Sequence, residues 1–354
     1  MAYLFVVLLL LLSGTLVGLP LLPAICELRQ KQDAEPLKVI QQHAGDIRYF
    51  ASSFATLIKE LEPLVNRSRT SGDVFRGVLP DGSQYIIMRT VDELPRMQKQ
   101  NDLFLCPNVI AFSNDVTCPG QIKFAKELYV HGQFRGGDCN QYRAVLGMSG
   151  IRLGKRSSVL RWAHAAFELV ADEECQLYGR VSAAGYLTIS QGCRFFRLNA
   201  PRINIGQGSG NNPANRVPRE PGVSVPLRRV LHHGDVIIEA GEVVYGSIVA
   251  RGKLHLRSGA KVVGSIKSNK DLVIENEAVV EGGVICSERM IVGSRCTLLG
   301  PIIAERSMVL YHGTVCGDLQ KPTTVSSPEI QVQEGVVIFG TLWARQSGSV
   351  WGRA

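Results

Sequence analysis

The chain has 354 residues, enough for about two domains, with 39 Lys and Arg against 31 Asp and Glu, a formal net charge of +8. The basic residues are spread out, without a dense basic run or a nucleic-acid motif, so a solvated outer face is favoured and no nucleic-acid partner is expected. Nine cysteines lack any Cys-x-x-Cys spacing, which disfavours a disulfide framework and a metal site. Cys175, Cys193 and Cys296 fall where a small apolar residue would serve.

An uncharged apolar run opens the chain. Residues 2–25 are long enough to cross about 30 Å of hydrocarbon, which predicts a transmembrane anchor over residues 1–26. A cleaved signal peptide is the alternative, disfavoured because no Lys or Arg precedes the run. Lipidation at Cys26 is disfavoured by the residue before it. Arg29, Lys31 and Lys38 follow the run and predict a single-pass protein with its C-terminal part in the cytoplasm.

An amphipathic helix and a hairpin are predicted next. Residues 27–66 contain apolar side chains at helical spacing, between Pro36 and Pro63. This helix either pairs with a second copy or covers the open edge of the following fold, and covering is the preferred interpretation. Residues 67–102 are a junction, in which two apolar runs within 74–90 flank Pro80-Asp81-Gly82 and predict a short hairpin.

A period of 18 residues dominates the rest of the chain. Its turn glycines are Gly246, Gly264, Gly282 and Gly300, followed by Gly317 one residue early and Gly340 after an insertion. Aliphatic residues keep fixed offsets from these glycines, as in the series Ile248, Ile266, Val284, Ile302 and the series Leu254, Leu272, Met290, Met308. Such a repeat indicates stacked units that bury a continuous core, and 18 residues suit one three-sided turn of a β-helix. The fold class is therefore all-β, a β-solenoid.

The repeat predicts two sections of β-helix. A first section spans 103–205 and a second spans 228–354, with roughly a dozen coils in all. Residues 206–227 are rich in Gly, Pro and Asn and have no period, which predicts a loop. This loop either separates two stacked halves or bulges from one continuous rod. The bulge is preferred because the period resumes directly at Arg228.

The last coil is apolar and lacks a polar cap. The candidate self-association residues are Val337, Phe339, Leu342, Trp343 and Trp351. An open apolar coil invites a further coil to stack on it, because this extends the backbone hydrogen bonds and buries the aromatic side chains. Alternatively, Trp343 and Trp351 fold back over the end. Self-association is the preferred interpretation.

No catalytic or cofactor-binding group stands out. Histidines occur singly, at His131, His164, His255 and His312, apart from the pair His232-His233, whose side chains would point to opposite faces of a strand. The carboxylates Asp235, Asp271 and Asp318 are isolated, and Glu173-Glu174 divides between two faces. Gly206 to Gly210 lacks the Gly-Lys-Ser/Thr ending of a phosphate loop. We therefore expect no enzyme activity, no cofactor and no metal.

The segment from Asp235 to Gly340, with GSIVARGKLHLRSGAKVVGSI and VVEGGVICSERMIVG, resembles a bactofilin domain. The resemblance implies a bacterial cytoskeletal protein with a right-handed β-helix that polymerises without nucleotide. Minimal members have about half as many coils as are predicted here, and they lack the span and the helix–hairpin junction. The handedness is implied by the resemblance alone.

Together these observations predict a membrane-anchored scaffold at the bacterial inner membrane, with its β-helix on the cytoplasmic side. It would associate with itself through β-helix ends and position envelope or cell-shape proteins. The alternative is an envelope protein that binds or modifies polysaccharide with an outward-facing rod.

Overall fold

The computed structural model describes residues 47–94, 98–206 and 229–352, together with scattered helical positions between residues 3 and 19. The chain divides into two units, residues 1–46 and residues 47–354. No helix among the described residues is long and apolar enough to cross a membrane. The predicted span over residues 2–25 lies largely outside the described residues, as does the predicted helix before residue 47. The remaining description concerns the second unit.

Two α-helices, a short 3-10 helix and two hairpins open this unit. They comprise α2 (Tyr49–Lys59), α3 (Glu62–Ser71), β1 (Phe75–Val78), β2 (Gln84–Met88), η1 (Val91–Glu93), β3 (Gln98–Gln100) and β4 (Leu103–Cys106). The β1–β2 hairpin confirms the hairpin expected within 74–90. Pro63 does not end the helix as predicted, because it lies in the first turn of α3, where a missing N–H costs nothing. Gly72, with φ 81°, ends α3 instead.

The first section of the solenoid is built from parallel strands. They are β5 (Val109–Phe112), β6 (Val116–Cys118), β7 (Ile122–Val130), β8 (Phe134–Gly136), β9 (Gln141–Gly147), β10 (Ile151–Leu153), β11 (Ser158–Ala165), β12 (Glu168–Ala171), β13 (Gln176–Ala183), β14 (Tyr186–Ile189) and β15 (Arg194–Ile205). β2 already pairs in parallel with β5, so the solenoid begins near residue 84 and not at 103.

The second section has shorter strands and the same period. They are β16 (Arg229–His232), β17 (Val236–Ile238), β18 (Val243–Tyr245), β19 (Ser247–Ala250), β20 (Leu254–Leu256), β21 (Lys261–Val263), β22 (Ile266–Ser268), β23 (Leu272–Ile274), β24 (Val279–Val280), β25 (Val284–Cys286), β26 (Arg289–Val292), β27 (Thr297–Leu298), β28 (Ile302–Ala304), β29 (Ser307–Leu310), β30 (Val315–Cys316), β31 (Thr323–Gln333) and β32 (Val337–Trp351).

Stacking of the coils places residues 18 apart in register. Ile248 pairs with Ile266, which pairs with Val284, and each of these side chains is at most 4% exposed. The apolar offsets read from the sequence therefore form columns inside the rod, as expected for a right-handed β-solenoid. One column continues through both sections, through Ile302, Val325, Leu342, Leu198, Val181, Ala163, Val145, Leu128, Ile110 and Ile86.

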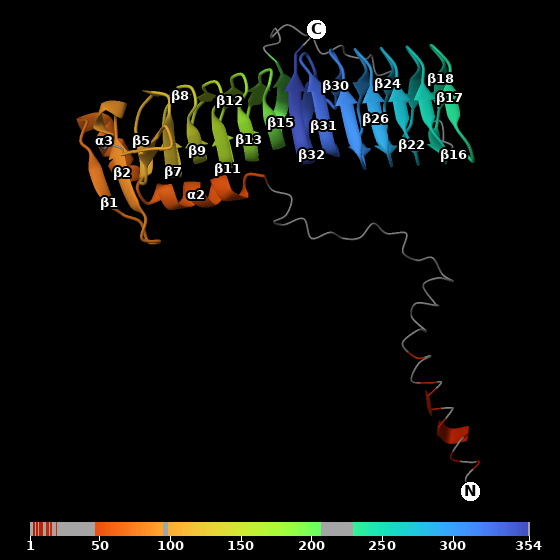
Figure 1. Ribbon diagram of the computed structural model, residues 1–354, viewed down its shortest axis with the longest axis horizontal. Coiled ribbons are helices and arrows are strands. Elements are labelled where there is room, and N and C mark those ends of the chain that lie inside the picture. The colour runs from red at the N-terminus through yellow and green to blue at the C-terminus, as the bar shows by residue number, and fades with distance from the viewer. Residues whose placement is uncertain are drawn as a thin grey trace. The chain divides into compact units, whose positions relative to one another are not determined.

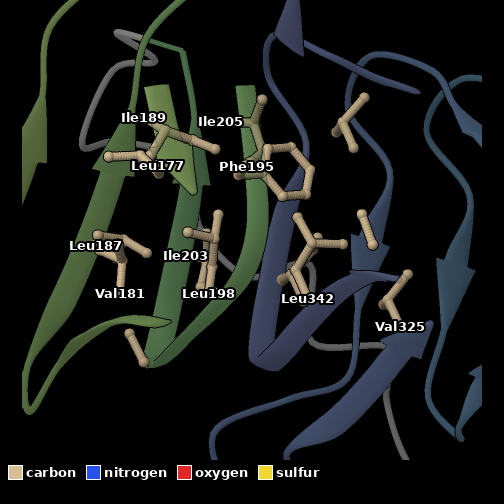
Figure 2. Close-up of a cluster of buried hydrophobic side chains, with 14 of the residues drawn as sticks. Leu177, Val181, Leu187, Ile189, Phe195, Leu198, Ile203, Ile205, Val325 and Leu342 are labelled. Atoms are coloured by element: carbon tan, nitrogen blue, oxygen red, sulfur yellow. The ribbon is translucent and has the colours of Figure 1, made fainter. Parts of the chain in front are cut away.

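The two sections meet by their last coils. β15 pairs with β32 in antiparallel orientation on all three sides of the coil, so the sections run in opposite directions (Figure 1). Leu198 lies opposite Leu342 at this joint, with Phe195 and Ile203 packed beside them (Figure 2). The preferred interpretation of a bulge in one continuous rod is therefore wrong, because β16 pairs with β19 at the far end of the second section.

The helices lie along a side of the first section. α2 contacts β9 and β11, and α3 contacts β2. Phe54 and Ile58 of α2 are buried with Ala144, Leu146 and Trp162, which point outward from the sheet. This outward apolar strip explains why the amphipathic helix covers this part of the rod (Figure 1). The helices cover a side face, however, and not the open edge of the first coil as predicted.

Candidate self-association surfaces

The first coil of the second section is an open end of the rod. Among the described residues β16 pairs only with β19, β17 only with β20, and β18 only with β21. One edge of each strand therefore has no partner strand within the described part of the chain. Unpaired strand edges of this kind are templates for pairing with another strand. We call residues 229–245 the open coil; it lies at the end of the rod marked β16, β17 and β18 in Figure 1.

Core positions of the open coil are less covered than the same positions inside the rod. Val230 occupies the same core column as Ile248, yet it is 41% exposed, whereas Ile248 is 4% exposed. Ile237, 53% exposed, and Tyr245, 61% exposed, stand at outward-facing positions of the same coil, in register with His255 and Val263. Clustered apolar exposure next to free strand edges indicates a surface for another protein chain. This surface was not predicted from the sequence, although one signal was present: the period begins again at Val230 after a segment that has no period.

Two of the three strand edges at the opposite end of the rod are covered by further strands, and η1 contacts β6 at the third. β1 covers the free edge of β2 as an antiparallel strand, and β3 covers the edge of β4 in the same way. Both covering strands are short, and they carry Arg76 and Lys99. Short strands with charged side chains are a common means of preventing edge-to-edge pairing. The two ends of the rod therefore differ in kind.

The predicted association residues at the C-terminus lie in the joint. Leu342 is fully buried, and Val337 and Phe339 are 9% and 7% exposed. Trp343 lies opposite Arg197 of β15, whose guanidinium carbon is 4.8 Å from the centroid of the indole ring. Trp351 packs edge-on against Tyr311. The last coil is therefore not an open end, because the first section of the same chain occupies its edge. A role for these residues between copies stays a prediction.

The repeat glycines mark a corner where the coils approach most closely. Gly264 has φ 154°, and a Cβ atom there would clash with the carbonyl group of Gly246. Gly282 and Gly300 would meet the glycine one coil earlier in the same way. Gly317 and Gly340 have φ 74° and 116°, which side chains disfavour. The 18-residue glycine period thus has a steric cause, the absence of space between stacked corners.

The candidate catalytic groups do not converge. His232 and His233 are both exposed on the open coil. The other histidines have separate partners: His131 contacts Tyr129 and Arg69, His164 contacts Ser182, His255 contacts Glu275, and His312 contacts the backbone oxygen of Glu334. Asp235 accepts a hydrogen bond from the backbone N–H of Lys253. Within the described ranges, no group of three or more His, Cys, Asp and Glu could hold a metal ion.

Charged side chains form ladders of alternating sign on the outside of the second section. Asp271 lies between Lys253 and Arg289, one coil away on either side, at 4.0 and 3.4 Å. The hydrogen bond from Arg289 holds the pKa of Asp271 below its ordinary value. Arg295 pairs with Glu277 in the same manner. Such exposed pairs are worth little individually, so they indicate a solvated outer face.

The cysteines serve as core residues. Cys175, Cys193 and Cys296 are fully buried, which confirms their prediction as small apolar residues. Burial raises the pKa of the Cys118 thiol to about 12 and that of Cys296 to about 11. Because the thiolate is the reactive form, these thiols should be unreactive in the folded protein. Cys139 is the one cysteine of the described ranges that is partly exposed.

A scan against protein-family models matches residues 236–342 to bactofilin, described as polymer-forming cytoskeletal. The matched segment runs from the first residue of β17 to Leu342 at the joint, less than half of the chain. No curated protein and no solved structure matches the chain. The match and the solenoid together fit the bactofilin family and support a polymer-forming cytoskeletal role for the second section.

Proposed function

We propose that this chain is a non-enzymatic scaffold of the polymer-forming cytoskeletal type, which associates with itself through an end of its β-solenoid. The observation that carries this proposal is the combination of the bactofilin match with an open coil inside or next to the matched segment. Exposed core-column residues at that coil, above all Val230, require a covering partner. A rod of stacked coils is a suitable scaffold because each coil contacts only its neighbours, and its length can be extended.

Sedimentation velocity of the full chain, purified in detergent, tests self-association. We expect the fraction of assembled protein to rise with concentration in the micromolar range, and negative-stain electron micrographs should show particles longer than one rod. A single-chain species at every concentration would contradict the scaffold function. Shortening the chain at Gly340 is not a clean test, because it removes the strand with which β15 pairs.

The second part of the proposal concerns location. The uncharged run at residues 2–25 supports a membrane anchor, and the basic residues that follow it support a cytoplasmic rod. At the bacterial inner membrane, such a rod would position envelope or cell-shape proteins. Anionic lipids of the inner leaflet would attract a chain with a formal charge of +8.

Cys139 can report the side of the membrane on which the rod lies. It is partly exposed, whereas the other cysteines of the described ranges are buried. We expect a membrane-impermeant maleimide to leave Cys139 unlabelled in intact spheroplasts and to label it after lysis. The variant Cys139→Ser identifies the signal, since Cys26 lies outside the described residues. Labelling of Cys139 in intact spheroplasts would place the rod outside and would favour the polysaccharide-binding alternative.

A further inference from the structure

The geometry of the joint indicates how the open coil meets its partner. This inference rests on the proposed function, since it assumes that the chain associates with itself. The rod has one closed end, where β1 and β3 cover two of the three strand edges and η1 contacts β6 at the third, and one open end at residues 229–245. The last coils of both sections are already joined inside the chain. Assembly is therefore left with one free solenoid end per chain in the described part of the molecule.

The internal joint has the pattern of a two-fold contact. Its central side pairs like with like: Leu198 and Leu342 belong to the same core column and lie opposite each other. The other two sides are exchanged. Ile203 lies on the side that follows Leu198 along the chain. It pairs with Ile338, which lies on the side that precedes Leu342. Correspondingly, Phe195 before Leu198 pairs with Gly348 after Leu342. This exchange is what a two-fold axis through the central side produces.

The open coil carries the same three sides. Val230 stands in the column of Leu342, and Val236 stands in the column of Gly348. Val244 stands in the column of Ile338. Each side presents an unpaired strand, and its core-column residue is less covered than the next one along the column: Val230 is exposed, and Val236 and Val244 are half-buried, whereas Leu254 and Val262 are buried. A second open coil offers the same edges and the same apolar residues, so the surface is complementary to itself.

We propose that two copies of this chain join through their open coils about a two-fold axis. β16 pairs in antiparallel orientation with β16 of the second copy, so that Val230 lies opposite its own equivalent. β17 pairs with β18 of the second copy, which brings Val236 opposite Val244. The contact continues the core column from one rod into the next and covers Val230. Because β1 and β3 cover two of the three strand edges at each far end and η1 contacts β6 at the third, the assembly stops at two chains and four solenoid sections.

Cysteine cross-linking of the full chain tests this arrangement directly. Opposed residues of antiparallel strands have Cα atoms about 4.5–5.5 Å apart, which is within the range of a disulfide. Val230→Cys should therefore give a two-chain band on a non-reducing gel after mild oxidation. Val236→Cys should give no such band alone, because its own equivalent is not opposite. A mixture of Val236→Cys and Val244→Cys should restore the band. The parent chain gives the background from its own cysteines.

A matched pair of charge variants tests the energetics in solution. Val230→Lys combined with Tyr245→Lys places two charges on the open coil, at side chains that are already exposed. Ile285→Lys combined with Ile291→Lys adds the same charge to exposed side chains in the middle of the section. We expect the first variant to weaken association by roughly a hundred-fold, because apolar burial is lost and like charges oppose each other, and the second to leave it unchanged. Both should retain the circular dichroism of the parent.

The outcomes separate this inference from the proposed function. A parent chain that stays single at all concentrations overturns both. Association that persists in Val230→Lys/Tyr245→Lys, with no Val230→Cys band, overturns the inference and leaves the scaffold function standing. Particles of many chains that lengthen with concentration would show that the end beneath β1 and β3 also associates, which overturns the two-chain limit.

Discussion

Replacing Leu342 by aspartate should destabilise the rod by about 4–5 kcal/mol, since the change removes a fully buried side chain and leaves an unpaired charge at the centre of the joint. For a domain of this size, such a loss corresponds to a fall of roughly 10 °C in the melting temperature. Circular dichroism during heating measures the change. Hydrogen exchange should rise in both β15 and β32, because each strand covers an edge of the other.

Gln346→Asp is the matched control for this substitution. It introduces the same charge at an exposed position of β32, so we expect the melting temperature to change by less than about 2 °C. Leu342→Ala should give an intermediate loss of about 2–4 kcal/mol, since it leaves a cavity without a charge. If hydrogen exchange in β15 does not change when Leu342 is replaced by aspartate, the two sections do not meet at this coil.

Phe54→Ala should release α2 from the side of the first section. Phe54 is 7% exposed, and its ring centroid lies 5.7 Å from that of Trp162 on β11. Truncation of a buried phenylalanine costs about 3–4 kcal/mol, which exceeds the intrinsic stability of a helix as short as α2. Trp162 would then be exposed, and its fluorescence emission should shift to longer wavelength. Comparison with Trp162→Phe separates this signal from those of Trp343 and Trp351.

Phe50→Ala provides the control on the same helix. Phe50 is 39% exposed, and its ring contacts the Arg180 guanidinium, 5.1 Å from the ring centroid, and the neighbouring Tyr49 ring. A cation–π contact at an exposed site is worth about 0.5–1 kcal/mol, so α2 should stay bound and the emission of Trp162 should not move. An equal shift in both variants would mean that Phe54 does not hold the helix.

The core of the solenoid could be predicted in detail because its signal is local and repeated. Each coil must place small or aliphatic residues at the same offsets, as at Leu254, Leu272 and Met290, or the column is interrupted. Glycine recurs where a Cβ atom would meet the coil before it, as at Gly264. The cysteines at core positions followed from the same frame. These features depend on what one coil requires of its direct neighbour.

The sequence did not show the contacts between segments that lie far apart in the chain. A proline such as Pro63 is compatible both with the end of a helix and with the first turn of the next one. The sequence therefore did not show that the helical region divides into α2 and α3. The association surface was assigned to the last coil because that coil is apolar. An apolar coil is equally suited to another section of its own chain, and β15 is the partner that the structure shows.

The sequence by itself determined the coil: its 18-residue length, its three sides, the columns that fill it and the glycine corner that lets it stack. Only the tertiary structure decided the direction of the second section, and with it which end is joined, which is closed and which is open. The physical reason is that a strand edge can accept a parallel or an antiparallel neighbour with nearly the same side chains. The same 18-residue period is therefore found whether the second section continues in the direction of the first or runs in the opposite direction. Because β15 pairs with β32, more than a hundred residues away in the chain, it does not pair with β16. The coil at Val230 is open for that reason.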